Sequence, residues 1–282
     1  MTSKSSSQDQ SSSDFSDELK PGTCLLHGQY VISQFLNNGG FGITYLAKDS
    51  LHRLVVIKEC YPEAICRRDG DTVCARSRNH GEAYEKMVRL FVEEARNLAR
   101  LSHPNIVGVH QVFEDNGTAY MALDYVDGLD LLELAERKDA IAPKALEGMV
   151  IKLLEAIEFI HSEGILHRDI APDNILLRDN REPILIDFGA ARETVTRATR
   201  YLGAIQAVKD GYSPQEFYVA DADQFPSSDL YSLGASLYHV ITREIPPNAQ
   251  ERLSAIAGGD PDPCKPLAGR ETGHSETFLA SI

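Results

Sequence analysis

The first half of the chain alternates short apolar runs with turn residues, a pattern typical of antiparallel strands. Apolar residues at helical spacing predict one amphipathic helix over 84–101, which ends before His103 and Pro104. We therefore expect a small domain of one sheet and one helix over residues 21–123. Its five predicted strands cover residues 30–36, 43–47, 54–58, 106–113 and 118–123.

Helical spacing dominates after residue 128. A wide apolar stripe over 146–160 indicates a long helix inside a core, and residues 230–241 predict another helix. Residues 278–282 look like the first turns of a helix at which the chain stops. The expected fold class is α+β, with a second, larger and mainly helical lobe over 129–282 that is incomplete at its C-terminal end.

Two segments do not follow these patterns. Residues 1–20 are rich in Ser and carry no periodic apolar positions, so we expect a disordered tail. Residues 61–83 form a long insert in the first lobe, rich in arginine within an otherwise acidic chain. The insert is either a docking or phosphate-sensing patch or a solvated loop.

Composition and charge limit the kinds of binding partner and the cellular compartment that we expect. The formal net charge is −14 and the pI is near 5.1, which argues against nucleic acid or an anionic membrane surface as partner. No apolar run reaches the roughly 18 residues of a membrane span, and no signal region is evident, so we expect a cytoplasmic protein. The five cysteines include no C-x-x-C pair, so neither a disulfide framework nor a zinc site is indicated.

Metal and phosphate chemistry is indicated by the stretch from His167 to Asn174 and by Asp187 thirteen residues later. Apolar runs between Asn174 and Asp187 predict a hairpin, so both side chains could close on one metal from its two sides. Upstream, a turn over 37–42 contains glycines, which let backbone N–H groups approach a phosphate chain. A strand bearing Lys58 follows that turn.

These motifs, in this order, resemble the eukaryotic-type (Hanks-type) serine/threonine protein kinases found in bacteria. The catalytic loop reads H-R-D-x-x-x-x-N over 167–174 and the metal loop D-F-G over 187–189. The resemblance covers roughly residues 25–282. It implies a bilobal protein-kinase fold, with a small antiparallel N-lobe sheet and one helix, a hinge at 124–128 and a larger helical C-lobe.

The resemblance also implies residue roles. Asp169 would be the catalytic base, Asn174 and Asp187 would bind Mg²⁺, with Mn²⁺ as an alternative, and Lys58 would hold the α- and β-phosphates of ATP. Asp130 would reach the ribose, or would instead begin a helix as its N-terminal residue. The implied nucleotide-binding residues are Asn37, Gly39, Gly42, Val56, Lys58, Glu94, Asp124, Val126, Asp130 and Leu176.

The chain departs from the family at several positions. Asn37 stands where the first glycine of the loop is usual. Ala171 stands where these kinases usually carry a lysine that reaches the γ-phosphate. Lys209, from the segment before Gly211 and Tyr212, is predicted to supply that charge as a catalytic residue; the alternative is an exposed lysine in a mobile loop. Glu216 is expected to lack its usual arginine partner.

The implied function is transfer of the γ-phosphate of ATP to Ser or Thr hydroxyls of protein substrates. Autophosphorylation is expected in the activation segment, at Thr194, Thr196 or Thr199. Asp130 and Asp173, together with the net charge, favour substrates that are basic around the target residue. A regulatory partner could complete the C-lobe. The alternatives are a pseudokinase that binds nucleotide as a scaffold, and a small-molecule kinase, which would not be expected to carry the 211–216 motif.

Overall fold

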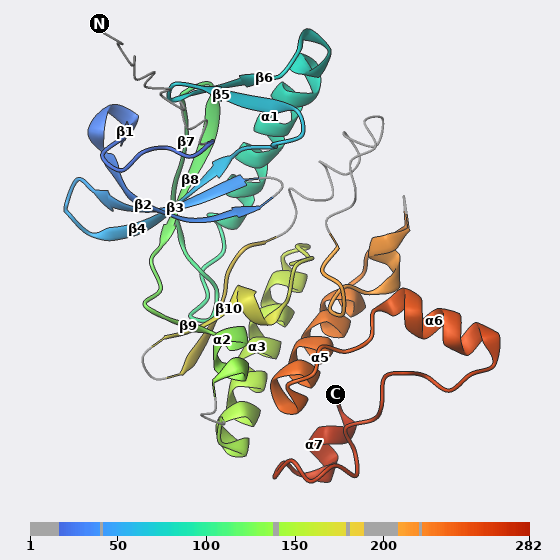
Figure 1. The fold of residues 1–282 in the computed structure, drawn as a ribbon. Helices are drawn as coiled ribbons and strands as arrows, with labels where there is room; N and C mark the ends of the chain where they lie inside the picture. Colours follow the sequence, from blue (N-terminus) through green and yellow to red (C-terminus); the bar gives the residue numbers. More distant parts are fainter. Residues whose placement is uncertain (1–16, 40–41, 138–140, 179–180, 189–207, 220–221) are drawn as a thin grey trace, which may run out of the picture.

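The computed structural model describes residues 17–39, 42–137, 141–178, 181–188, 208–219 and 222–282. The chain forms two lobes, a strand-rich N-lobe and a helical C-lobe (Figure 1). Among the described residues, no helix is long and apolar enough to cross a membrane.

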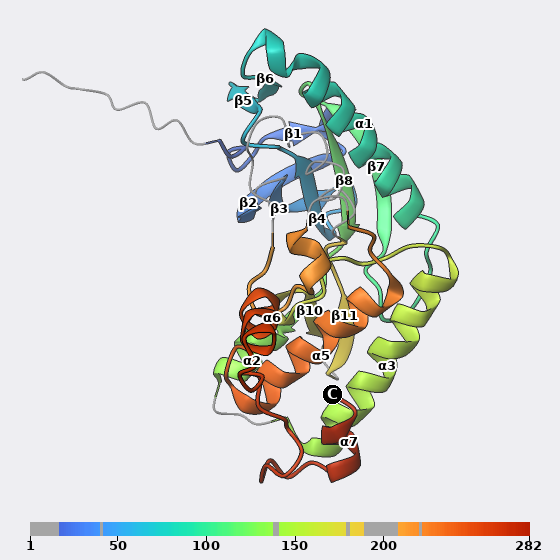
Figure 2. The ribbon, with the colours of Figure 1, turned by 90° about the vertical axis from the view of Figure 1, so that its right-hand side faces the viewer.

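The N-lobe is built on an antiparallel sheet with the order β1-β2-β3-β4-β8-β7. Helix α1 (Gly81–Leu98) lies along one face of it (Figure 2), and its buried side chains include Met87, Phe91 and Ala95. The five predicted strands and the helix are confirmed within a few residues. These five strands are β2 (Tyr30–Gly39), β3 (Gly42–Asp49), β4 (Leu54–Cys60), β7 (Val109–Asp115) and β8 (Thr118–Asp124). The short strand β1 (Cys24–Leu25) is the sixth strand of the sheet.

The arginine-rich insert contains an ordered hairpin, β5 (Cys66–Asp69) paired with β6 (Thr72–Ala75). Its Arg68 is buried: the guanidinium bonds Glu59 of β4 at 2.5 Å and the backbone oxygen of Asp17 at 2.6 Å. Arg76 bonds the backbone oxygens of Glu63 and Cys66. Arg68 is therefore an internal anchor of the insert, whereas Arg76 is exposed and bonds only the backbone of the insert.

The described chain begins at Asp17, inside the range predicted as a tail. Leu19 is 2% exposed, and its backbone N–H donates to the Tyr45 hydroxyl at 3.1 Å. Asp17 accepts a hydrogen bond from the Tyr61 hydroxyl at 2.6 Å. Residues 17–19 thus pack onto the N-lobe.

The C-lobe is mainly helical, as predicted, and includes a small antiparallel sheet with the order β11-β10-β9. Leu185 bonds both Asn105 and Val107 through the backbone, which ties the strand before Asp187 to the segment that follows α1. The helices are α2 (Leu131–Glu136), α3 (Pro143–Ser162), α5 (Pro226–Thr242), α6 (Ala249–Gly258) and α7 (Glu276–Ala280), with strands β9 (Gly128–Asp130), β10 (Ile175–Arg178) and β11 (Glu182–Leu185).

Candidate active site

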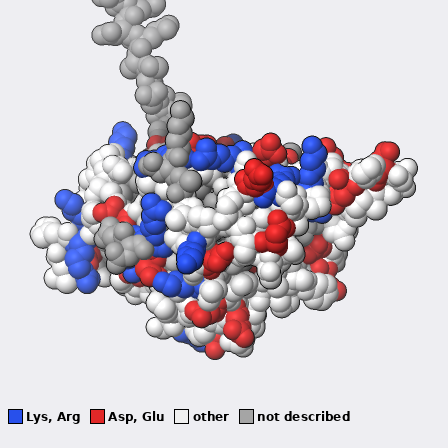
Figure 3. Space-filling view, turned by 90° about the horizontal axis from the view of Figure 1, so that it is seen from below, with Lys and Arg blue, Asp and Glu red and all other residues white. Residues whose placement is uncertain are grey.

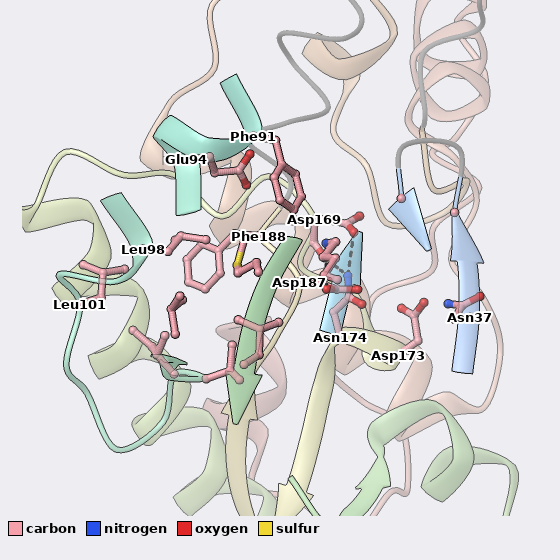
Figure 4. Close-up of a pocket in the computed structure, with 18 of the residues that line it drawn as sticks. Asn37, Phe91, Glu94, Leu98, Leu101, Asp169, Asp173, Asn174, Asp187 and Phe188 are labelled. Carbon is pink, nitrogen blue, oxygen red and sulfur yellow. Dashed lines mark hydrogen bonds and ion pairs between the residues drawn. The ribbon is translucent and has the colours of Figure 1, made fainter. Parts of the chain in front are cut away.

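One cleft gathers most of the predicted site residues, and it lies where the two lobes meet (Figure 4). Its deeper wall is apolar and includes Phe91, Leu98, Leu101 and Phe188. None of these four was among the predicted site residues, because their helical or buried spacing indicates only a core. The predicted residues that line the cleft are Asn37, Gly39, Gly42, Lys58, Glu94, Asp169, Asn174, Asp187 and Lys209.

The loop that carries Asp169 is held from below by α5. Asp229, which is 1% exposed, accepts hydrogen bonds from the backbone N–H groups of His167 at 2.9 Å and Arg168 at 2.8 Å. Its carboxylate also contacts His161 Nε2 at 2.8 Å. Arg168 has a φ of 66°, a backbone conformation that a non-glycine residue adopts only when its surroundings enforce it. Asp229, in the first turn of α5, was not among the predicted site residues.

His167 is a fixed part of the cleft floor. It is fully buried, its Nδ1 accepts from the Asp169 N–H at 3.3 Å, and its Nε2 lies 3.0 Å from the Ile186 carbonyl oxygen. The ring also packs on Phe188, with centroids 4.5 Å apart. Burial lowers the pKa of His167 to about 4. The histidine is therefore neutral at pH 7 and orients Asp169.

Asn174 and Asp169 are joined directly (Figure 4). The amide nitrogen Nδ2 of Asn174 donates to the carboxylate Oδ2 and to the backbone oxygen of Asp169, both at 2.7 Å. Both residues are nearly buried, at 5% and 6% exposure. The Asp169 carboxylate is thus fixed in direction by the Asn174 amide.

Asp187 lies beside this pair and adopts a left-handed backbone with a φ of 57°. Its Oδ1 accepts from Lys58 Nζ at 2.9 Å, so a strand of the N-lobe and the metal loop of the C-lobe are linked across the cleft. Glu94 faces the same cleft from α1 (Figure 4). A pairing of Lys58 with Glu94 stays a prediction.

The predicted glycine turn joins β2 to β3, with Gly39 opposite Gly42; residues 40 and 41 lie outside the described residues. A Cβ on Gly42 would lie 2.6 Å from the backbone oxygen of Glu59, so only glycine fits there without movement. Asn37 takes part in β2 opposite Thr44 and lines the cleft.

The five residues predicted around the base and ribose of ATP are not among those that line this cleft. Val56 of β4 is opposite Leu123 of β8, and Leu176 of β10 is opposite Asp130 of β9. Asp124 ends β8, pairs with His110 at 2.9 Å and accepts from the Gly108 N–H at 3.1 Å. Val126, in the predicted hinge, is buried at 6% exposure.

Asp130 begins α2. Its Oδ1 accepts from the Glu133 N–H at 2.7 Å, and the Asp130 N–H donates to the Glu133 carboxylate at 3.4 Å, which together form a capping box. Burial raises the pKa of Asp130. The interpretation as a helix N-terminal residue is confirmed, and the contact with a ribose stays a prediction.

Lys209 reaches the cleft from the segment that precedes Tyr212. Its Nζ lies 2.8 Å from both carboxylate oxygens of Asp173 and 3.7 Å from Asp169 Oδ2. Its side chain is 25% exposed, so the alternative of an exposed lysine does not describe it. The structure does not describe residues 189–207, and the predicted phosphorylation sites Thr194, Thr196 and Thr199 lie there.

Glu216 accepts a hydrogen bond from the Ser228 hydroxyl at the start of α5. The motif around it is anchored by Tyr212, whose hydroxyl lies 2.6 Å from His239 Nδ1.

The donors in the cleft fit a magnesium ion that also binds phosphate. Within the described part of the chain, no group of three His, Cys, Asp or Glu side chains is arranged to hold a metal. Mg²⁺ is typically bound by one or two carboxylates and by substrate phosphates, and it keeps several waters. The Asp187 carboxylate and the Asn174 amide oxygen would be the protein ligands of such an ion.

Comparisons with known proteins agree with this geometry. The protein kinase domain family model matches residues 30–259. Serine/threonine-protein kinase D of Synechocystis sp. is 33% identical over 228 residues, which cover 77% of this chain and 41% of that protein. Serine/threonine-protein kinase PknB of Mycobacterium tuberculosis is 31% identical over 258 residues, 87% of this chain and 38% of that protein. The chain thus spans about two fifths of the length of these curated relatives.

A solved structure titled "PpkA-294 apo form" has the same fold. It superposes with a TM-score of 0.79, is 33% identical in sequence, and the match covers 94% of this chain and 91% of that one. The order of the motifs, the bilobal fold, the family match and these relatives lead to one conclusion: the chain belongs to the protein kinase family.

Proposed function

We propose that this chain is an active kinase domain that transfers the γ-phosphate of ATP to Ser and Thr hydroxyls of proteins. The observation that carries the proposal is the convergence of Lys58 from β4, Asp169 and Asn174 from the catalytic loop, and Asp187 from the metal loop on one cleft. The serine/threonine kinases among its relatives support the same reaction.

Each residue has a distinct task. Asp169, aimed by Asn174, accepts the proton of the substrate hydroxyl as its oxygen attacks the γ-phosphorus. Lys58 meets the α- and β-phosphates. Asn174 and Asp187 hold Mg²⁺, which when bound offsets negative charge on the phosphates. His167 stays neutral and keeps the loop in position.

The nucleotide would bind along the rest of the cleft. The turn between Gly39 and Gly42 covers the phosphates, and Glu94 orients Lys58. Val56 and Leu176 sandwich the adenine, and Asp130 contacts the ribose. Backbone groups of Asp124 and Val126 read the edge of the base.

Further proposals concern substrates and regulation. We expect autophosphorylation at Thr194, Thr196 or Thr199 and a cytoplasmic location. A preference for basic substrates now rests on the net charge of −14, because Asp130 and Asp173 both have internal partners. Acidic and basic side chains are interspersed on the C-lobe face shown in Figure 3, so we place any such preference near the cleft. A regulatory partner at the C-lobe is a separate proposal.

The test compares the wild type with Asp169→Asn and, as a matched control, Asp127→Asn on the exposed hinge. Each protein is incubated with Mg-ATP and a generic basic protein, and phosphosites are mapped by mass spectrometry. We expect phosphoserine and phosphothreonine with the wild type and the control, and none with Asp169→Asn. A scaffold without turnover would transfer phosphate with none of the three.

A further inference from the structure

Two cations face the cleft among the residues that the structure describes: Lys58 and Lys209. They lie on different sides of the acidic groups. Lys58 is paired with Asp187 at the metal loop, whereas Lys209 lies between Asp173 and Asp169 at the catalytic loop. The Nζ of Lys209 lies 3.7 Å from Asp169 Oδ2, so this lysine brings positive charge to the base.

The position of Lys209 is built into the local backbone. Its N–H donates to the Ser213 hydroxyl at 3.0 Å, and its carbonyl oxygen accepts from the N–H groups of Tyr212 at 3.0 Å and Ser213 at 2.9 Å. Gly211 closes this turn with a φ of 87°, and a Cβ there would lie 2.5 Å from the Ile245 side chain. A turn fixed in this way holds the lysine stem toward the cleft.

Phosphoryl transfer needs positive charge at this place. The transferred group carries negative charge over its oxygens in the transition state, and Asp169 must receive a proton close to it. The loop itself offers none between Asp169 and Asp173, because Ala171 has only a buried methyl group. Without Lys209, two carboxylates would face the phosphate from this side.

We propose that Lys209 is the cation that stabilises the transferring γ-phosphoryl group beside Asp169, and that Asp173 is its positioning residue. This inference rests on the proposed kinase activity. In the step, the substrate oxygen forms a bond to the γ-phosphorus, the bond to the bridging oxygen breaks, and ADP leaves. Asp169 takes the hydroxyl proton, and Lys209 remains protonated throughout.

The proposal changes the expected role of Asp173. A carboxylate that binds a basic residue of the substrate must be available to it, but both oxygens of Asp173 contact Lys209. As a positioning residue, Asp173 affects kcat with every substrate. As a selector, it would affect KM with basic substrates alone.

The main experiment compares Lys209→Met, which keeps the stem but not the charge, with Lys209→Arg, which keeps the charge. Lys152→Met is the matched control, since Lys152 pairs with Glu182 on the C-lobe surface. We expect Lys209→Met to lose about a hundredfold in kcat, as for other preorganised charges at a transition state. Lys209→Arg recovers part of this loss, and the control stays at the wild-type rate.

Nucleotide affinity gives a readout that needs no turnover. We expect Lys209→Met to bind a non-hydrolysable ATP analogue more weakly, while its affinity for ADP stays unchanged. A kcat within threefold of the wild type would overturn the proposal, as would equal weakening of both nucleotides. A wild type that transfers no phosphate would refute the kinase activity, and the two affinities would still decide whether Lys209 faces the γ-phosphate.

Asp173→Asn tests the positioning role with two peptide substrates, one basic around its serine and one neutral. We expect kcat to fall with both peptides and their KM ratio to stay as in the wild type. A rise in KM confined to the basic peptide, with kcat unchanged, would assign Asp173 to substrate selection and overturn this part of the proposal.

Discussion

Lys58 and Glu59 are neighbours on β4, yet their side chains enter two different charge clusters. Glu59 is fully buried and pairs at 2.5 Å with Arg68, whose side chain is 4% exposed. Lys58 points into the cleft and pairs at 2.9 Å with Asp187, and these side chains are 24% and 34% exposed. The strand therefore carries a buried ion pair on one face and a partly solvent-exposed ion pair on the other.

Two tyrosine hydroxyl groups complete the hydrogen bonding of the buried cluster around Glu59. The hydroxyls of Tyr45 and Tyr120 donate to the two oxygens of Glu59 at 2.9 and 2.8 Å. Burial, together with the nearby Glu59 carboxylate, raises the pKa of both tyrosines above the usual range, so both stay protonated and donate. Arg68 also lies over the Tyr61 ring, 5.2 Å from its centroid.

The difference separates structural from functional charge. A buried and satisfied ion pair leaves no room for a ligand, and it fixes the insert against the sheet. The pairs of Lys58 and Lys209 are partly exposed to solvent, so phosphate oxygens can approach both ammonium groups.

Arg68→Met gives the largest expected change in stability. It leaves Glu59 buried without its cation, and breaking a buried pair in this way typically costs about 3–5 kcal/mol of the free energy of unfolding. Denaturant unfolding of the wild type and the variant measures this loss. The double variant with Glu59→Met should recover much of the loss, because well-packed apolar groups can replace such a pair.

The matched control for Arg68→Met is Arg89→Met, which removes the exposed Arg89–Glu85 pair on α1. It should change the free energy of unfolding by less than about 0.5 kcal/mol. Equal losses for Arg68→Met and Arg89→Met would show that the buried pair does not anchor the insert.

Arg68 also illustrates a structural feature that could not be predicted from the sequence. Apolar periodicity located β2, β3, β4, β7, β8 and the helices α1, α3 and α5, because their buried faces follow a regular period. The β5–β6 hairpin was missed, since its arginines indicate solvent and the partner that buries Arg68 lies on another strand. A long-range charge pair leaves no local pattern in the sequence.

The functional site likewise contains residues that the sequence predicted and contacts that it did not. Sequence spacing placed Asn174 and Asp187 together, and the resemblance to protein kinases assigned Asp169 and Lys209 to the same site. Sequence spacing could not reveal that Asp229 binds backbone N–H groups of the catalytic loop, or that Asp173 holds Lys209. Both contacts depend on how helices and loops pack in three dimensions.

His167 tests whether burial alone, without an ion pair, makes the cleft floor sensitive to pH. Its pKa is about 4 in the folded chain against an ordinary value near 6.5, so protons favour the unfolded state between these values. Stability from this group is complete above pH 6.5 and is lost as the pH falls toward 4. Between pH 7 and pH 5 the loss should be about 2 kcal/mol.

The measurement for His167 is denaturant unfolding at both pH values for the wild type and His167→Asn. The variant is expected to be less stable at pH 7 but to lose about 2 kcal/mol less on acidification. If wild type and variant lost the same free energy between pH 7 and pH 5, other groups would account for the acid sensitivity.

Lys58→Met completes the contrast with its neighbour Glu59. Because the Lys58–Asp187 pair is partly solvated, its loss should change the free energy of unfolding by less than about 1 kcal/mol. Binding should respond differently: Mg-ATP is expected to raise the melting temperature of the wild type but not of the variant, since the α- and β-phosphates lose their cation. A destabilisation as large as that of Arg68→Met would instead mean that the cleft pair is structural, and that the two faces of β4 do not differ in the way proposed.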